Sequence, residues 1–175
     1  CAVMVSGFFV VAQIYAVLPL LDGIATDLRI GGAQASFIPT AFGLAYAAGL
    51  LVFGPIADRT DRMTLLVTGL VALAAASACV ALAQSFEGLL WGRMLQGLAA
   101  STFPATALAL VSQRTPTQDQ PLAISLLGFS FLSSAPLSQA MVEASGRPFG
   151  HIMAWSGALY LLCATAMLLT GSKPR

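Results

Sequence analysis

Residues 63–83 read MTLLVTGLVALAAASACVALA, a run of 21 residues without a single charged side chain. An α-helix rises about 1.5 Å per residue, so this run is long enough to cross a bilayer hydrocarbon core about 30 Å thick. Within lipid, a single segment satisfies its backbone amides only by bonding to itself as a helix. The run therefore predicts a transmembrane helix.

Five more apolar stretches flank this one on both sides. Together, the six predicted spans are residues 2–21, 33–56, 63–83, 89–111, 122–142 and 152–170. Apolar residues make up 58% of the chain and charged residues only 9%, and the charges cluster in the gaps between spans. We expect one all-α membrane domain, residues 1–175, consisting of six transmembrane helices surrounded by lipid.

Small residues recur at intervals of four within three of the spans. They are Ala41, Ala45 and Gly49, then Ala74 and Ala78, then Gly97 and Ser101. This spacing lets helix backbones approach closely, so a packed bundle is expected. Pro39, Pro104 and Pro136 are expected to bend their spans. Bent helices suit a rocking transporter, but they also occur in static membrane proteins.

The composition also argues against several classes of function. A formal net charge of +1 gives no reason to expect a nucleic-acid partner. Cys1, Cys79 and Cys163 are odd in number and lack metal-ligand spacing, so we interpret them as packing residues. No catalytic residue, metal site, cofactor or enzyme activity is predicted. Because the chain begins with cysteine instead of methionine, it is expected to be a fragment or a processed product.

The positions of the basic residues predict the orientation in the membrane. With a cytoplasmic N-terminus, the inner side holds Arg59, Arg62, Arg114, Lys173 and Arg175, and the outer side holds Arg29 and Arg147. Because positive side chains resist translocation, both termini are predicted to be cytoplasmic. Trp91, Trp155 and His151 then lie near the outer interface.

The turn between the second and third spans holds a dense group of charges. An unpaired carboxylate is costly at a membrane boundary, so Asp58 is expected to pair with Arg59, Arg62 or a helix N-terminus. Gly54 is expected to remove a side chain where two helices touch. A charge cluster that fits only one packing of two bundles would hold that packing in place, because breaking it costs energy when the bundles move. The alternative is an ordinary basic hairpin loop.

The fourth span contains an arginine, in the segment RMLQG at residues 93–97. Arg93 must face protein, a water-filled cavity or the interface, because facing lipid is expensive. Gln96 shares its helix face, and Gly97 permits close approach of a neighbouring helix. Arg93 either shifts the pKa of a nearby acid or binds an anionic group. Alternatively, its side chain extends past Trp91 to the outer headgroups.

Other polar residues within the spans are candidates for a substrate pathway. They are Gln13, Tyr15, Ser125, Ser130, Ser133, Ser134 and Gln139. The three serines at 130, 133 and 134 share one helix face, which favours a lined cavity. Serine and glutamine in membrane helices also commonly bond to their own backbone or to a neighbouring helix, and the sequence leaves both interpretations open.

Residues 54–63, GPIADRTDRM, resemble the loop signature G-x-x-x-D-R-x-G-R-[KR] of the major facilitator superfamily. Gly54, Asp58, Arg59 and Arg62 match it, while Asp61 replaces the second glycine and Met63 the last basic residue. Aspartate tolerates a left-handed backbone, so the turn is expected to survive the change. Residues 93–97 resemble the R-x-x-Q-G segment of proton-driven members.

Residues 13–19, QIYAVLP, resemble the drug-efflux and sugar-efflux branches of that family. Many proton-coupled members of these branches carry an acid in the first helix, where this chain has Gln13 as its nearest polar residue. Antiporters often carry G-P-x-x-G-G in the fifth helix, of which only Pro136 is kept. The support for antiport is therefore weak.

The resemblance implies the N-terminal six-helix half of such a transporter, built from two inverted three-helix repeats. It implies a secondary transporter in a bacterial-type inner membrane that works by alternating access, in the direction of efflux and with proton coupling, while an antiporter is only weakly supported. A small-molecule substrate would bind between this half and a second six-helix half, which is missing here. Asp58, Arg59 and Arg62 would gate, while Arg93, Gln96, Gly97, Gln13 and Tyr15 would couple transport or line the path. The alternatives are a non-transporting structural or assembly subunit and an inactive half-transporter fragment.

Overall fold

A computed structural model of the chain describes residues 2–171, except the side chains at positions 2, 58, 170 and 171. These residues form helices and connecting turns, without a strand. The helices are α1 (Ala2–Tyr15), the 3-10 helix η1 (Leu18–Leu20), α2 (Leu21–Asp27), α3 (Gly32–Ala35), α4 (Phe37–Arg59), α5 (Arg62–Ala81), α6 (Phe86–Ala100), α7 (Phe103–Arg114), α8 (Gln120–Ser145) and α9 (Phe149–Gly171).

Within the described residues, the helices combine into six segments that are long and apolar enough to cross a membrane. They are Val3–Asp27, Gly32–Ala57, Arg62–Ala81, Phe86–Arg114, Gln120–Ser145 and Phe149–Leu169. The predicted fold class, an all-α protein with six transmembrane helices, is confirmed.

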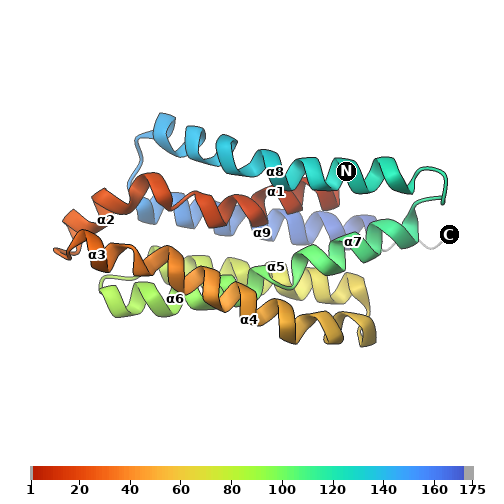
Figure 1. Ribbon diagram of the computed structural model, residues 1–175, viewed down its shortest axis with the longest axis horizontal. Helices are drawn as coiled ribbons and strands as arrows, with labels where there is room; N and C mark the ends of the chain where they lie inside the picture. Colours follow the sequence, from red (N-terminus) through yellow and green to blue (C-terminus); the bar gives the residue numbers. More distant parts are fainter. Residues whose placement is uncertain (1, 172–175) are drawn as a thin grey trace.

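The six segments run alternately in opposite directions along the long axis of the bundle (Figure 1). The α4–α5 and α7–α8 turns lie at the same end as the N-terminus. The α2–α3, α5–α6 and α8–α9 connections lie at the opposite end, which we call the distal end. The main helix pairs are α4 with α6, α5 with α9 and α1 with α8.

The first membrane segment is longer than the predicted span. Residues 22–32 were expected to form a polar connector, but α2 continues the segment to Asp27. Asp22 lies in the first turn of α2, where a carboxylate is favourable, and Ile24 is buried. The direction of the chain changes only at Arg29, whose φ is 52°, and at the following glycines.

The prolines act differently according to their position in a helix. The fourth membrane segment is interrupted at Ser101 and Thr102, and Pro104 lies in the first turn of α7. Proline has no N–H to donate to a carbonyl one turn earlier, so the helix is interrupted here, where a bend was expected. Pro39 lies in the first turn of α4, where no such bond is needed, and the α8 helix continues through Pro136.

Glycines set the distance between α6 and its neighbours. A Cβ atom on Gly97 would collide with the carbonyl oxygen of Phe42 and would lie 3.1 Å from the backbone nitrogen of Tyr46. A Cβ atom on Gly92 would lie 3.5 Å from the Cα of Val80 in α5. The close approach predicted at Gly97 is therefore present, and α6 packs almost backbone to backbone against α4.

Candidate functional site

The side chain of Arg93 is enclosed in the bundle, with none of its surface exposed. Its Nη1 donates a hydrogen bond to Gln96 Oε1 at 2.9 Å, and its Nη2 donates a longer one, 3.4 Å, to the Gln13 carbonyl. Its Cζ lies 4.5 Å from the centre of the Phe42 ring, within range of a cation–π interaction. Arg93 therefore faces protein and does not extend past Trp91 to the interface.

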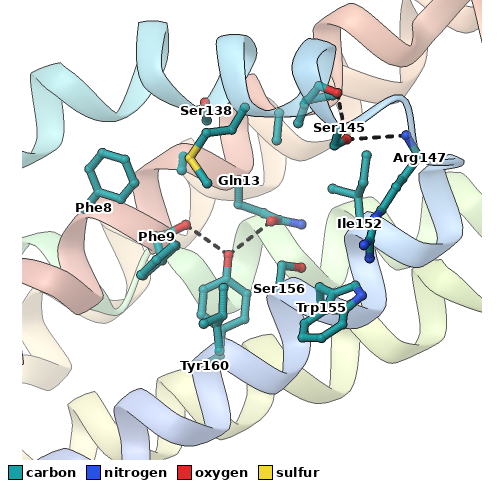
Figure 2. A pocket seen from close by; sticks show the side chains of 15 residues that line it. Phe8, Phe9, Gln13, Ser138, Ser145, Arg147, Ile152, Trp155, Ser156 and Tyr160 are labelled. Atoms are coloured by element: carbon teal, nitrogen blue, oxygen red, sulfur yellow. Dashed lines mark hydrogen bonds between the residues drawn. The ribbon is translucent and has the colours of Figure 1, made fainter.

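Gln96 and Gln13 connect Arg93 to two further helices. Gln96 Nε2 donates to Ser77 Oγ of α5 at 2.9 Å. Gln13 Nε2 lies 3.0 Å from Met153 Sδ of α9. The hydroxyl of Tyr160, also in α9, lies 3.0 Å from both Gln13 Oε1 and the Phe9 carbonyl. Figure 2 shows the hydroxyl between these two acceptors. We call Arg93, Gln96, Gln13, Ser77 and Tyr160 the Arg93 cluster.

The charge of Arg93 is not balanced by an acid within the described residues. In the part of the chain that the structure describes, no carboxylate lies within salt-bridge distance of its guanidinium, and its Nε has no hydrogen-bond partner. A cation that is buried in a membrane protein without a counter-ion is costly, and such groups are usually retained for function. The cluster is therefore suited to bind an anionic group. The alternative role, shifting the pKa of an acid, would require a carboxylate other than those described here.

Close packing places the members of this cluster. Arg93 and Gln96 are three residues apart and so lie on one face of α6. Gly97 brings α4 close enough for Phe42 to cover the guanidinium. The other helices contribute residues that are distant in the chain, with 80 residues separating Gln13 from Arg93.

Other predicted pathway residues do not join the cluster. Tyr15 is half-buried and lies two residues after Gln13, roughly 200° around the helix. Ser130, Ser133 and Ser134 each donate to a carbonyl three residues earlier in α8. The three serine hydroxyls therefore bond to the backbone of their own helix, which is one of the two interpretations that the sequence left open.

The charged loop shows two differences from its predicted structure. Asp61 has φ −59°, so it is not left-handed, and instead its carboxylate caps α5. The pKa of Asp61 is lowered, chiefly because the backbone N–H of Thr64 donates to the carboxylate and also because the Thr64 hydroxyl does. A Cβ atom on Gly54 would meet nothing within 4 Å, so the contact expected there is absent among the described residues.

The loop arginines occupy different environments. Arg62 Nη1 donates to the Ala109 carbonyl of α7 at 2.9 Å, which joins the third membrane segment to the fourth. Arg59 is exposed. The side chain of Asp58 lies outside the described part of the chain, so its pairing with Arg59 or Arg62 stays a prediction.

Replacing Asp61 with alanine should lower the free energy of unfolding by about 1 kcal/mol, because the capping acceptor of α5 is lost. The Asp61→Asn variant keeps an oxygen acceptor at this position and should retain most of that stability. Chemical unfolding in detergent micelles measures both values. Equal losses in the two variants would show that the negative charge matters and the cap does not.

Two members of the Arg93 cluster, Ser77 and Tyr160, were not predicted from the sequence, and neither was Phe42, which covers the guanidinium. A signal existed for two of them, since Ser77 and Tyr160 are polar residues inside apolar spans. Phe42 gives no such signal, because an aromatic residue in a membrane helix usually packs against other apolar groups.

Comparison with known proteins agrees with this architecture. The profile of the Major Facilitator Superfamily matches residues 3–173. The Escherichia coli K12 inner membrane transport protein YajR is 32% identical over 160 residues, which are 89% of this chain and 34% of YajR. The riboflavin transporter RibZ of Clostridioides difficile is 29% identical over 129 residues, 71% of this chain and 28% of RibZ.

A solved structure shows the same fold. The crystal structure of a bacterial homologue of the human lysosomal transporter Spinster, inward-facing and unoccupied, superposes with a TM-score of 0.89 at 17% identity. The match covers 99% of this chain and 42% of that one. The chain spans less than half the length of each of these relatives.

The fold and the profile together define a multi-pass membrane protein of a transporter family. The chain belongs to the Major Facilitator Superfamily, as an N-terminal half of its fold.

Proposed function

We propose that this chain serves in secondary active transport of a small molecule, in the direction of efflux and coupled to protons, by alternating access in an inner membrane. The observation that carries the proposal is the buried Arg93 cluster, which holds a cation without a counter-ion among the described residues, enclosed by helices of a transporter family. Such a cation attracts the anionic part of a substrate or an acid that carries the coupling proton. A second six-helix half supplies the other side of the substrate site.

The gating loop is assigned to Asp58, Arg59 and Arg62. The bond from Arg62 to the Ala109 carbonyl supports this role, because it fixes one arrangement of the α5 and α7 helix ends. Alternating access requires two arrangements that differ by only a few kcal/mol, and breaking such a bond changes their balance. A Cβ atom on Gly54 would meet nothing within 4 Å, which leaves space there for the proposed second half.

Efflux can be tested in bacterial cells that express the chain together with a second six-helix half, with ethidium and riboflavin as probes. Riboflavin is included because RibZ is named a riboflavin transporter. We expect Arg93→Met to slow efflux by about tenfold or more, equivalent to at least about 1.4 kcal/mol. Arg93→Lys should also fail, because an ammonium cannot reproduce the planar fork of the guanidinium. A protonophore should abolish efflux by the unsubstituted chain.

The matched control is Arg29→Gln, which removes an exposed charge and should leave efflux unchanged. Efflux that persists in Arg93→Met at normal membrane abundance would contradict the proposal and favour the assembly-subunit alternative. Absence of efflux even with Arg93 intact would favour the inactive half-transporter alternative.

The proposed orientation places both termini in the cytoplasm, which single-cysteine labelling can test. In a variant with Cys1, Cys79 and Cys163 replaced by serine, Arg29→Cys should react with an impermeant maleimide in intact cells. Arg59→Cys should react only after the membrane is opened, because its loop lies at the other end of the bundle. Labelling of both positions in intact cells would contradict the orientation.

A further inference from the structure

A groove of about 230 Å³ lies between α1, α8 and α9. It exists because α8 packs on α1 and hardly contacts α9. The two helices diverge from the turn at residues 146–148, where Gly146 has φ 56°. The groove walls are mostly apolar, with Phe8, Met141 and Leu159 contributed by the three helices.

The hydroxyl groups of Ser138, Ser156 and Tyr160 along the groove already donate their hydrogens within the protein. Ser138 Oγ donates to the Ala135 carbonyl and Ser156 Oγ to the Met153 carbonyl. At the floor, the Tyr160 hydroxyl is held between Gln13 Oε1 and the Phe9 carbonyl (Figure 2). Because these hydroxyl groups bond to the backbone or to Gln13, the surface exposed along the groove is mostly hydrocarbon.

The distal end of the groove carries a positive charge, whereas the walls along the rest of the groove are apolar. Arg147 lies there, exposed, with its Cζ 5.9 Å from the centre of the Trp155 ring (Figure 2). No carboxylate among the described residues lies within salt-bridge distance of Arg147. Trp155 is 60% exposed, and indole rings favour the level of the lipid headgroups. A cation therefore stands at headgroup level, directly above an apolar groove.

We propose that this groove binds an anionic phospholipid, with one acyl chain along the groove and the headgroup phosphate on Arg147. The apolar walls match the acyl chain, and the unpaired guanidinium matches the phosphate. A zwitterionic lipid offers the same chain, but its headgroup has no net charge to attract Arg147. The groove shares Gln13 and Tyr160 with the Arg93 cluster at its floor, but lipid binding needs only the membrane that surrounds the bundle.

The chain has two tryptophans, so fluorescence quenching can report on this groove alone. The Trp91→Phe variant leaves Trp155 as the reporter, in nanodiscs containing a brominated lipid at a fixed mole fraction. Brominated phosphatidylglycerol is expected to quench Trp155 with about fivefold higher apparent affinity than brominated phosphatidylcholine, the preference that one basic residue provides. Arg147→Gln in the same background should remove the preference.

Two matched controls decide the interpretation. Arg29→Gln removes an exposed positive charge at the same end of the bundle and should keep the preference. Trp155→Phe leaves the exposed Trp91 as reporter, and the two lipids should then quench equally. The Ser156→Phe variant fills the groove and should weaken the quenching of Trp155 by either lipid. An unchanged thermal unfolding transition of this variant would verify that it is folded.

The proposal fails if both lipids quench Trp155 equally, or if the preference survives Arg147→Gln. Loss of the preference in Arg29→Gln would also overturn it, because the effect would then be general surface charge. If neither lipid quenches Trp155, protein covers the groove and no lipid binds there.

Discussion

Replacing Gln96 with leucine is expected to lower the free energy of unfolding by about 3 kcal/mol. Gln96 Oε1 is the acceptor of the short bond from Arg93 and is buried with it. Hydrogen bonds to charged groups contribute about 1.5–3 kcal/mol, and leaving the Ser77 hydroxyl unpaired adds about 1 kcal/mol or more. The guanidinium would retain only the 3.4 Å bond to the Gln13 carbonyl and the contact with Phe42.

The double variant Arg93→Met with Gln96→Leu should be more stable than Gln96→Leu alone, because no buried cation is left without its acceptor. A double-mutant cycle, measured by equilibrium unfolding in detergent micelles, gives the coupling free energy. We expect a coupling of about 2 kcal/mol. Gln139→Leu, which changes a half-buried glutamine outside the cluster, is the control and should change stability little. Additive effects of the two substitutions would contradict the proposed pairing.

The membrane fold was predictable because it depends on one strong physical requirement. Long apolar runs such as residues 63–83 have few alternatives to a helix in lipid, and the described residues form six helical segments long and apolar enough to cross a membrane. The ends of helices were less predictable, since they depend on local contacts. The α2 helix forms around the buried Ile24, and a hydropathy pattern does not reveal this contact.

Only the part of the Arg93 cluster that lies within one helix could be predicted from the sequence. A spacing of three residues places Gln96 beside Arg93, and the 2.9 Å bond between them follows. The bonds to Ser77 and Gln13 depend on how helices rotate against one another, which the sequence does not specify. Asp61 shows the opposite case, where a short-range rule was available. Aspartate three residues before Thr64 at a helix start indicates a capping residue, which explains the turn better than a left-handed backbone.

The substitution Gly97→Ala is expected to have the second large effect, a loss of about 2 kcal/mol in unfolding free energy. The added Cβ would collide with the Phe42 carbonyl, and backbone atoms cannot move aside as a flexible side chain can. Overpacking of this kind costs about 3 kcal/mol, while alanine gains about 1 kcal/mol over glycine within a helix. The collision therefore dominates, and α4 must move away from α6.

Gly128→Ala is the matched control, because a Cβ atom on Gly128 in α8 would meet nothing within 4 Å. It should stabilise the bundle by up to about 1 kcal/mol, so the two variants should differ by about 3 kcal/mol in equilibrium unfolding. Gly97→Ala should also move Phe42 away from the Arg93 guanidinium and weaken their cation–π contact. The same substitution should therefore reduce efflux when the chain is still folded at low temperature. Equal stability of the two variants would show that α4 and α6 separate without cost, and that Gly97 does not position Phe42 over Arg93.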